Sequence, residues 1–286
     1  MSTTFYPLLL SVGAMLCWGV LYIFTTKLTR SVGSYMTLIL FQSVSILLLL
    51  ILLPFVHQPI NIRGIGSFIT VGLWSGLMWL LFLHATNIGN VAIVLPVSNL
   101  SIPFIAFLGV FFLHESFSPA KAISVCFVFV GVILLGLDFK AIKNLKKQVL
   151  FKGVAPAIAA GFGVSIYVFI NTYLVRWYGW YNSSFFIRVG IVAVVAIVML
   201  LKHKKISLKK IPWIIVIGAA LVDTVGFILY NIALTGSELS YVSVITNSSM
   251  LITVILAAWL LKERLNKIQW FGFVCTMAGI VLLQLG

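Results

Sequence analysis

The sequence predicts an all-α integral membrane protein whose ten transmembrane helices form two inverted five-helix repeats. Of its 286 residues, 62% are hydrophobic and only 8% are charged, whereas a soluble domain of this size carries far more charge. Apolar runs of about 20 residues, the length that crosses a bilayer, recur along the chain. The second half also repeats the first at an offset of 148 residues.

The apolar runs are continuous rather than alternating, so they predict helices and not the strands of a barrel. The first run has no basic residues before it and extends to Thr26, which predicts a retained span rather than a cleaved signal peptide. A basic loop at 138–152 separates a first repeat at 1–137 from a second at 153–286. The expected spans are Phe5–Thr26, Ser34–Val56, Gly64–Ala85, Asn90–Leu113, Pro119–Leu137, Gly153–Val175, Trp180–Leu201, Ile211–Leu234, Leu239–Leu261 and Ile268–Leu285.

The internal repeat rests on polar and glycine matches, which are informative because these residue types are scarce here. The offset of 148 pairs Asn99 with Asn247, Ser101 with Ser249, Glu115 with Glu263, and Gly131 with Gly279. Each half has five spans, an odd number, so the second half must enter the membrane the opposite way up. Inverted repeats of this kind are typical of secondary transporters.

The net charge of +14 does not indicate nucleic-acid binding, because the basic residues lie in short clusters between apolar runs. The connections after odd-numbered spans hold most of them, whereas the opposite set holds only Arg63, Lys121 and Arg176. The positive-inside rule therefore predicts that both termini lie outside the cytoplasm. The richer set is Lys27, Arg30, Lys140, Lys143, Lys146, Lys147, Lys152, Lys202, Lys204, Lys205, Lys209, Lys210, Lys262, Arg264 and Lys267.

Each half ends with a span, a short polar turn carrying Glu, and a final span in which Gly precedes Leu-Leu. These residues are Glu115 with Gly131-Val-Ile-Leu-Leu135, and Glu263 with Gly279-Ile-Val-Leu-Leu283; the first span adds Cys17-Trp18-Gly19. Together they resemble the EamA-type branch of the drug/metabolite transporter superfamily over almost the whole chain. The resemblance implies a ten-helix fold with a central cavity, and transport of amino acids, other small metabolites or drugs.

One position departs from the pattern of this family. The second span of each half often carries an Arg near its start, and the second half keeps one at Arg188. The first half has Gln42 instead, so a substrate inferred from an arginine pair would not carry over.

Asp223 is the carboxylate that the sequence places deep in a span. Polar groups at this depth are costly and usually face a cavity or a partner. Two interpretations stay open: Asp223 binds a cationic or zwitterionic substrate or a proton, or it forms a buried ion pair with Arg188. His84, near the end of the third span, is a further candidate for proton coupling, or an interfacial histidine.

The fourth and ninth spans carry matched polar clusters at mid-membrane depth. Prolines at Pro96 and Pro103 flank the first cluster and interrupt its helix. Equivalent interrupted helices point to a binding site at the repeat interface, although hydrogen-bonded helix packing is the alternative. The candidate substrate-binding residues are Asp223, Asn99, Asn247, Ser98 and Thr246, with the in-span aromatics Trp18, Tyr22, Trp74, Trp79, Tyr167 and Tyr230, for which packing is the alternative role.

The chain has no phosphate-binding loop, nucleophile elbow or paired catalytic carboxylates, and we expect no enzymatic activity, cofactor or metal. The expected protein is a monomeric, multi-pass transporter of the plasma membrane, or of the inner membrane in a bacterium. Its expected partners are a small-molecule substrate, lipid and protons, with no nucleic acid. The alternatives are an uncoupled channel or facilitator, and a membrane-embedded enzyme acting on lipid.

Overall fold

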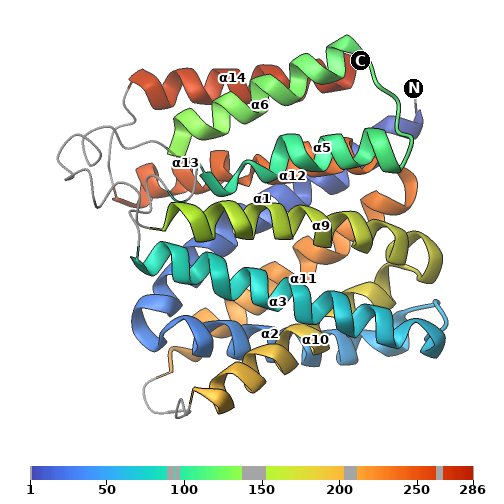
Figure 1. The fold of residues 1–286 in the computed structure, drawn as a ribbon, viewed down its shortest axis with the longest axis vertical. Coiled ribbons are helices and arrows are strands. Elements are labelled where there is room, and N and C mark those ends of the chain that lie inside the picture. The colour runs from blue at the N-terminus through green and yellow to red at the C-terminus, as the bar shows by residue number, and fades with distance from the viewer. Residues whose placement is uncertain are drawn as a thin grey trace.

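The computed structural model describes residues 2–88, 94, 97–136, 153–202, 211–261 and 267–285. These residues are helical without strands, which confirms the predicted all-α class of ten helices (Figure 1). Six helices are long and apolar enough to cross a membrane: α1 (Ser2–Val32), α2 (Ser34–Leu52), α3 (Ile65–Ile88), α9 (Val154–Tyr178), α10 (Trp180–Leu201) and α11 (Trp213–Gly236). Shorter apolar helices are α5 (Ser101–Phe112), α6 (Pro119–Gly136), α12 (Leu239–Asn247), α13 (Ser249–Leu261) and α14 (Lys267–Leu285), and 3₁₀ turns lie at Leu53–Phe55 and Ile62–Gly64.

Several helix ends differ from the predicted spans by a few residues, and those of α1 and α9 are followed by or contain basic residues. Helix α1 continues to Val32 rather than ending at Thr26, and α9 continues to Tyr178 rather than Val175. Hydropathy falls at Lys27 and Arg30, but long basic side chains at a helix end reach the interface while their stems stay on apolar surface. A charged residue therefore ends the apolar run without ending the helix.

The fourth and ninth spans are both interrupted at their midpoints. In the ninth, α12 ends at Asn247 and α13 begins at Ser249, with Ser248 in a turn. In the fourth, Asn99 and Leu100 form a turn and α5 begins at Ser101, the equivalent of Ser249. The first part of the fourth span, including Asn90 and Pro96, lies outside the described residues.

The two breaks have different local causes. Pro103 lies in the first turn of α5, where a missing N–H is tolerated, so it favours a helix start at Ser101. The second repeat has no proline there. Instead the hydroxyls of Thr246 and Ser248 bond back to the carbonyls of Val242 and Val244, each at 2.9 Å, and such back-bonding often bends helices.

Helix packing between the halves follows the two-fold symmetry of the repeat. Helix α1 packs on α11 as α9 packs on α3, and α3 packs on α10 as α11 packs on α2. Helices α6 and α14, the last of each half, pack on each other and form one edge of the bundle (Figure 1). This reciprocity confirms the two-repeat architecture.

Close contacts at equivalent glycines confirm the offset of 148 at the level of single atoms. A Cβ on Gly131 would meet Thr276 and the carbonyl of Gly272. A Cβ on Gly279 would meet Val128 and the carbonyl of Ser124, which are the equivalents of those two partners. Both glycines are therefore needed for the close approach of α6 and α14.

A single glycine joins the first two helices of each half. Gly33 between α1 and α2 has φ 81° and ψ 165°, and Gly179 between α9 and α10 has φ 89° and ψ 158°. This backbone region is essentially restricted to glycine. The same strained corner thus recurs in both repeats, at an offset of 146 that also pairs Gln42 with Arg188.

Candidate functional site

A cavity of about 340 Å³ extends from the two helix breaks toward the C-terminal ends of α1 and α3. Helices of both repeats contribute to its wall, as the family resemblance predicted for a central cavity. Its lining residues are Tyr22, Thr25, Thr26, Thr29, Arg30, Trp79, Phe82, Leu83, Thr86, Ser98, Asn99, Asn247, Ser249, Met250 and Thr253.

Two helices present regular stripes to this cavity. The α1 residues follow the spacing i, i+3, i+4, i+7, i+8, which places them on one helix face: Tyr22, Thr25, Thr26, Thr29 and Arg30. The α3 residues follow i, i+3, i+4, i+7 and are mostly apolar: Trp79, Phe82, Leu83 and Thr86. One wall is therefore rich in hydroxyls and the facing wall is aromatic.

The inner end of the cavity lies at the breaks. Ser98 and Asn99 come from the interrupted fourth span, and Asn247 and Ser249 flank the turn in the ninth. The amide nitrogen of Asn99 lies 3.8 Å from the sulfur of Met250, so the two breaks are in contact across the repeat interface.

A second, smaller cavity of about 110 Å³ adjoins the first. The two share Tyr22, Trp79, Phe82, Ser98, Asn99 and Asn247. The smaller cavity reaches toward α9, where Tyr167, Ala160, Gly161 and Val164 line it.

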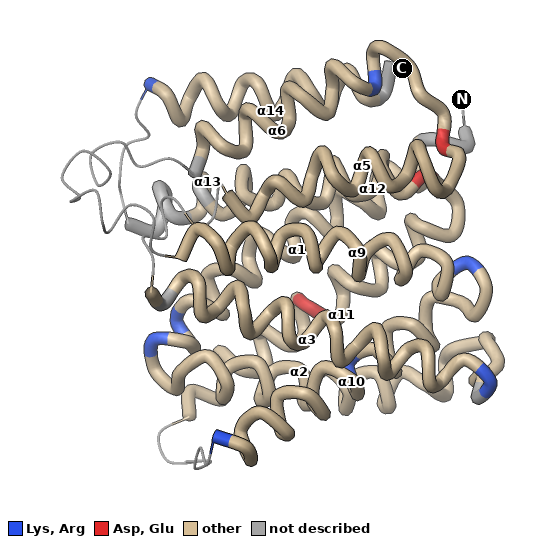
Figure 2. The backbone as a smooth tube through the Cα atoms, in the orientation of Figure 1, with Lys and Arg blue, Asp and Glu red and all other residues tan. Residues whose placement is uncertain are grey.

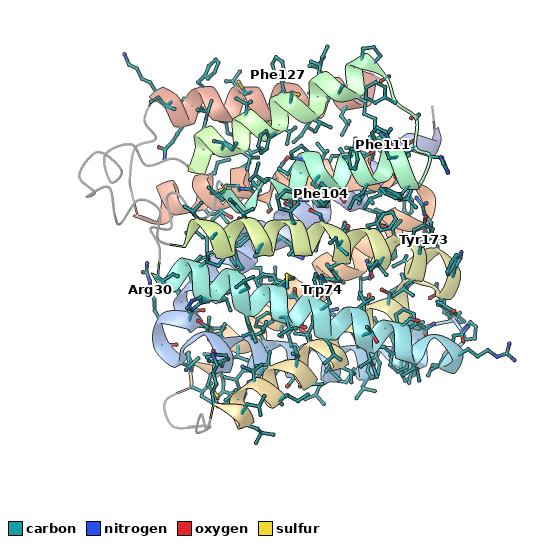
Figure 3. The ribbon with its side chains drawn as sticks, viewed as in Figure 1. Arg30, Trp74, Phe104, Phe111, Phe127 and Tyr173 are labelled. Atoms are coloured by element: carbon teal, nitrogen blue, oxygen red, sulfur yellow. The ribbon has the colours of Figure 1, made fainter. Side chains whose placement is uncertain are left out.

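The cavity has a distinct polarity along its length. Among the described lining residues, Arg30 at the outer end is charged and no carboxylate is present. Figure 3 places Arg30 at the end of the bundle opposite Tyr173. Deeper in the cavity, Thr25, Thr26 and Thr253 donate their hydroxyl hydrogens to main-chain carbonyls, and the Asn247 amide nitrogen donates to Ser243 at 2.8 Å. Their oxygen atoms remain as hydrogen-bond acceptors.

Asp223 forms a buried ion pair with Arg188 and lies outside the lining of both cavities. The Arg188 Nη2 to Asp223 Oδ2 distance is 2.8 Å, and the two side chains are 2% and 5% exposed. Gln42 donates to the same oxygen at 3.3 Å, and the Arg188 guanidinium lies 4.6 Å from the Phe227 ring centroid. The ion pair predicted as one interpretation is therefore present, and the repeat equivalents Gln42 and Arg188 both bind Asp223.

This ion pair belongs to a longer chain of buried polar contacts between α9, α10 and α11. Arg188 donates to the carbonyl of Ser184 at 2.9 Å, and the Ser184 hydroxyl accepts from Asn231 at 2.9 Å. Asn171 donates to Asn231 at 3.0 Å and accepts from Ser183. Figure 2 shows an acidic position at mid-bundle on α11, whereas the other acidic positions that the structure describes lie near the end that holds the termini.

At that end, the connection between α5 and α6 is bound to the start of α12. Glu115 accepts from the backbone N–H groups of Leu239 and Ser240. Carboxylates are stabilised at helix N-termini in this way. Lys121 lies 3.7 Å from Glu115 and 2.5 Å from Glu238.

Glu238 completes this cluster, which we call the Glu115 cluster: Glu115, Ser116, Lys121, Glu238, Leu239 and Ser240. Partial burial acts to raise the pKa of Glu238, but its hydrogen bonds to Lys121 and Ser116 outweigh burial, and its pKa falls below the ordinary value of 4.5. Glu238 is therefore ionised at neutral pH, and the cluster joins the first repeat to the second.

The structure brings together six of the eleven candidate substrate-binding residues at the two cavities: Ser98, Asn99, Asn247, Tyr22, Trp79 and Tyr167.

The other five candidates lie outside the lining of both cavities. Besides Asp223, Thr246 is buried and bonded to its own helix, and Trp18 packs against Tyr230, whose hydroxyl contacts Ser243 at 3.3 Å. Trp74 donates to the carbonyl of Gly163 at 2.8 Å. His84 is exposed on α3 and outside the lining of both cavities.

Sequence reasoning missed the threonines of α1 together with Arg30. The predicted first span ended at Thr26, so Thr29 and Arg30 were assigned to a connection. The signal that would have found them is the 3–4 spacing of polar residues on one helix face, which continues through Arg30.

Comparisons with known proteins agree with this architecture. A solved structure described as "Crystal structure of protein" superposes with a TM-score of 0.81 at 15% identity, covering 97% of this chain and 96% of that chain. This likeness shows the fold. An "Uncharacterized protein" of Haemophilus influenzae is 24% identical over 225 residues, which are 76% of this chain and 74% of that protein. An "Uncharacterized transporter in cobO 3'region" of Sinorhizobium sp is 36% identical over 66 residues, and the match spans 47% of that relative's length.

Two inverted five-helix repeats around a cavity define a membrane transporter of the ten-helix type. The model of the EamA-like transporter family matches residues 5–137 and 151–285, one match for each repeat. The chain belongs to this family, and it is a multi-pass membrane protein. Membership of this family points to a transporter rather than an enzyme.

Proposed function

We propose that this protein is a secondary transporter that moves a small zwitterionic metabolite, of the amino-acid type, by alternating access through the central cavity. The observation that carries the proposal is the shared cavity: both repeats contribute their broken helices to it, at equivalent positions. Broken helices at a repeat interface are the usual location of the binding site in inverted-repeat transporters.

The polarity of the cavity favours a zwitterion over a simple cation. Arg30 offers hydrogen-bond donors to a carboxylate at the outer end, since guanidinium and carboxylate groups pair in matched geometry. The oxygens of Thr25, Thr253 and Asn247 offer acceptors to an ammonium group farther in. Trp79 and Phe82 supply an apolar wall for a side chain.

Alternating access requires one end of the cavity to close when the other opens. The Glu115 cluster lies at the end of the bundle opposite Arg30 and joins the two repeats through charged contacts (Figures 2 and 3). These contacts serve as the closed gate of this state. A simple channel would need no such alternation.

We also propose that the cavity faces the cytoplasm. The basic residues of the connections after odd-numbered spans include Arg30 at the cavity mouth, and the positive-inside rule assigns that side to the cytoplasm of a plasma or bacterial inner membrane. A reporter that is active only in the cytoplasm, fused after Gly286, is expected to be silent. An active reporter would reverse the orientation.

The test is counterflow into proteoliposomes preloaded with one of a panel of amino acids, primary amines and carboxylic acids. We expect exchange of at least one amino acid, and a higher KM for it in Arg30→Gln while the KM of any transported amine is unchanged. Lys27→Gln is the matched control. Lys27 is also basic and lies one helical turn before Arg30, but it is outside the cavity lining. Exchange of amines alone would overturn the zwitterion assignment, and unsaturable flux without counterflow would favour an uncoupled pore.

A further inference from the structure

Four buried polar atoms around the Arg188–Asp223 pair have no hydrogen-bond partner among the described residues. They are Gln42 Oε1, Arg188 Nε, Thr224 Oγ1 and Tyr167 Oη. Each such atom destabilises the fold when it is left unpaired, because it has lost its hydrogen bonds to water. Several such atoms in one membrane-embedded region indicate a place that takes up a further polar species.

Tyr167 connects this region to the cavity. Its side chain lines the smaller cavity, although the residue is only 6% exposed. Its hydroxyl has no hydrogen-bond partner among the described residues, and it lies on α9, which packs against both α10 and α11, the helices that carry Arg188 and Asp223. A hydroxyl both donates and accepts a hydrogen bond, so Tyr167 can relay a proton between cavity water and the buried pair.

Gln42 suits Asp223 in either protonation state. Its amide nitrogen donates to Asp223 Oδ2 at 3.3 Å, as an ionised carboxylate requires, while its amide oxygen is unpaired. A protonated carboxyl needs an acceptor instead, and rotation of the same amide supplies one. An arginine at position 42, which carries donors alone, would favour the ionised form in every state.

Arg188 keeps partners when Asp223 is neutral. Its guanidinium donates to the carbonyls of Ser184 and Asp223 at 2.9 and 3.3 Å, and it lies over the Phe227 ring. Loss of the carboxylate charge therefore leaves a cation that is still hydrogen-bonded and held over an aromatic face.

We propose that Asp223 is a proton-binding site that receives its proton from the cavity by way of Tyr167. A hydronium ion in cavity water gives up its proton, the Asp223 carboxylate becomes a carboxylic acid, and water remains. The charge of the pair rises from zero to plus one, which breaks the ion pair between α10 and α11. The site thereby links proton binding to the packing of these two helices.

The groups that face Asp223 come from each neighbouring helix. Helix α10 brings Arg188, α2 brings the neutral Gln42, α9 brings Tyr167, and α1 brings the thiol of Cys17. Helix α12 contacts α11 through Ser243 and Tyr230. Among these, Asp223 is the acid whose protonation removes an existing ion pair.

Infrared difference spectroscopy across a pH step detects the proton directly, without any transported substrate. The chain has two aspartates, Asp138 and Asp223, so Asp138→Asn leaves one. We expect a carboxylic-acid band on acidification of this variant in lipid nanodiscs, and we expect the band to shift when aspartate carries a ¹³C carboxyl. A band insensitive to the label, or absent over the pH range in which the protein remains folded, would overturn the proposal.

The route is tested by the rate at which the band appears after a pH jump. Tyr167→Phe removes the relay hydroxyl and is expected to slow the band, whereas Tyr230→Phe, a buried tyrosine outside both cavities, is expected to leave the rate unchanged. Equal rates in both variants would exclude the route through Tyr167. The double variant Asp223→Asn, Arg188→Gln leaves no stranded charge and is expected to lack the band.

The claim that proton binding at Asp223 is coupled to transport rests on the function proposed above. Proton movement recorded with an internal pH dye during amino-acid exchange separates the two claims. Counterflow without proton movement would remove coupling and leave the transporter, whereas the infrared band would stand even if no tested amino acid were exchanged.

Discussion

Glu115 of the first repeat binds Ser240 of the second, accepting hydrogen bonds from both its backbone N–H, at 3.0 Å, and its hydroxyl. The contact stabilises the first turn of α12, nine residues of helix that end at the break beside the cavity. We therefore expect a movement of the α5–α6 connection to displace α12 and with it the inner end of the cavity. This mechanical link motivates the first prediction.

Cross-linking the Glu115 cluster is expected to stop transport. Ser116 and Glu238 are in contact, with the Ser116 hydroxyl 2.8 Å from the Glu238 carboxylate. In a background with Cys17, Cys126 and Cys275 replaced, Ser116→Cys with Glu238→Cys and a short, reducible thiol cross-linker should block counterflow, and reductant should restore it. Either cysteine alone is the control. Full activity of the cross-linked protein would show that this end of the bundle does not open.

The paired asparagines are expected to be accessible from the cavity. Asn247 lines it, whereas the preceding residue, Thr246, is fully buried. Asn247→Cys should therefore react with small aqueous thiol reagents much faster than Thr246→Cys in the same background. Asn99→Leu and Asn247→Leu should each impair exchange while leaving the protein folded. Equal protection of both cysteines in every transport state would contradict the cavity assignment.

Loss of one partner of the buried ion pair is expected to cost stability. Asp223→Asn leaves the Arg188 charge without its carboxylate, a change that typically costs about 3–5 kcal/mol in a buried pair. We expect a smaller loss here, because the carbonyls of Ser184 and Asp223 and the Phe227 ring still hold the guanidinium. Arg188→Gln in the same protein should recover most of this loss. Thermal unfolding of the two single variants and the double variant gives the coupling between the residues. Strict additivity of the two single effects would mean that the pair contributes nothing.

Gly33, which joins α1 to α2, is expected to tolerate no other residue without loss of stability, because of its backbone conformation and not because of crowding. A Cβ on Gly33 would meet nothing within 4 Å, but its φ of 81° is strained for any other residue. Gly33→Ala should therefore destabilise the protein by about 1–3 kcal/mol. Gly66, in α3, is equally open but has no positive φ, and Gly66→Ala should be neutral or stabilise by about 0.5–1 kcal/mol. Similar melting temperatures for the two variants would contradict the claim that the backbone conformation of Gly33 requires glycine.

The sequence predicted the spans and the repeat well, because both depend on hydropathy and on spacing along the chain. It also offered the ion pair with Arg188 as one of two interpretations of Asp223, and left open the choice that the structure shows as an ion pair. The ends of α1 were predicted less well, because a basic residue interrupts hydropathy without interrupting the helix.

The assignment of aromatic residues to the cavity could not be made from the sequence. Trp18, Trp74 and Trp79 all lie within spans, but only the rotation of each helix about its axis decides which of them meets the cavity. Trp79 lines it, Trp18 packs against Phe227 and Tyr230, and Trp74 binds a carbonyl of α9. Helix rotation is set by packing against neighbours such as the Gly72–Gly190 contact of α3 with α10, which one helix alone does not encode.

Gln42 on α2 and Arg188 on α10 occupy equivalent positions of the two repeats. They differ in charge, and Asp223 binds both. The equivalent of Asp223 in the first half is Ser75. The two halves therefore differ in charge at the positions that form the buried ion pair. A duplication with two identical halves would rest equally in its inward-facing and outward-facing forms. Under the alternating access proposed above, the two forms would place the same guanidinium in unequal surroundings, and we expect one of them to dominate at rest. That built-in bias would make the forward and return half-cycles run at different speeds, giving the carrier a kinetic direction of its own.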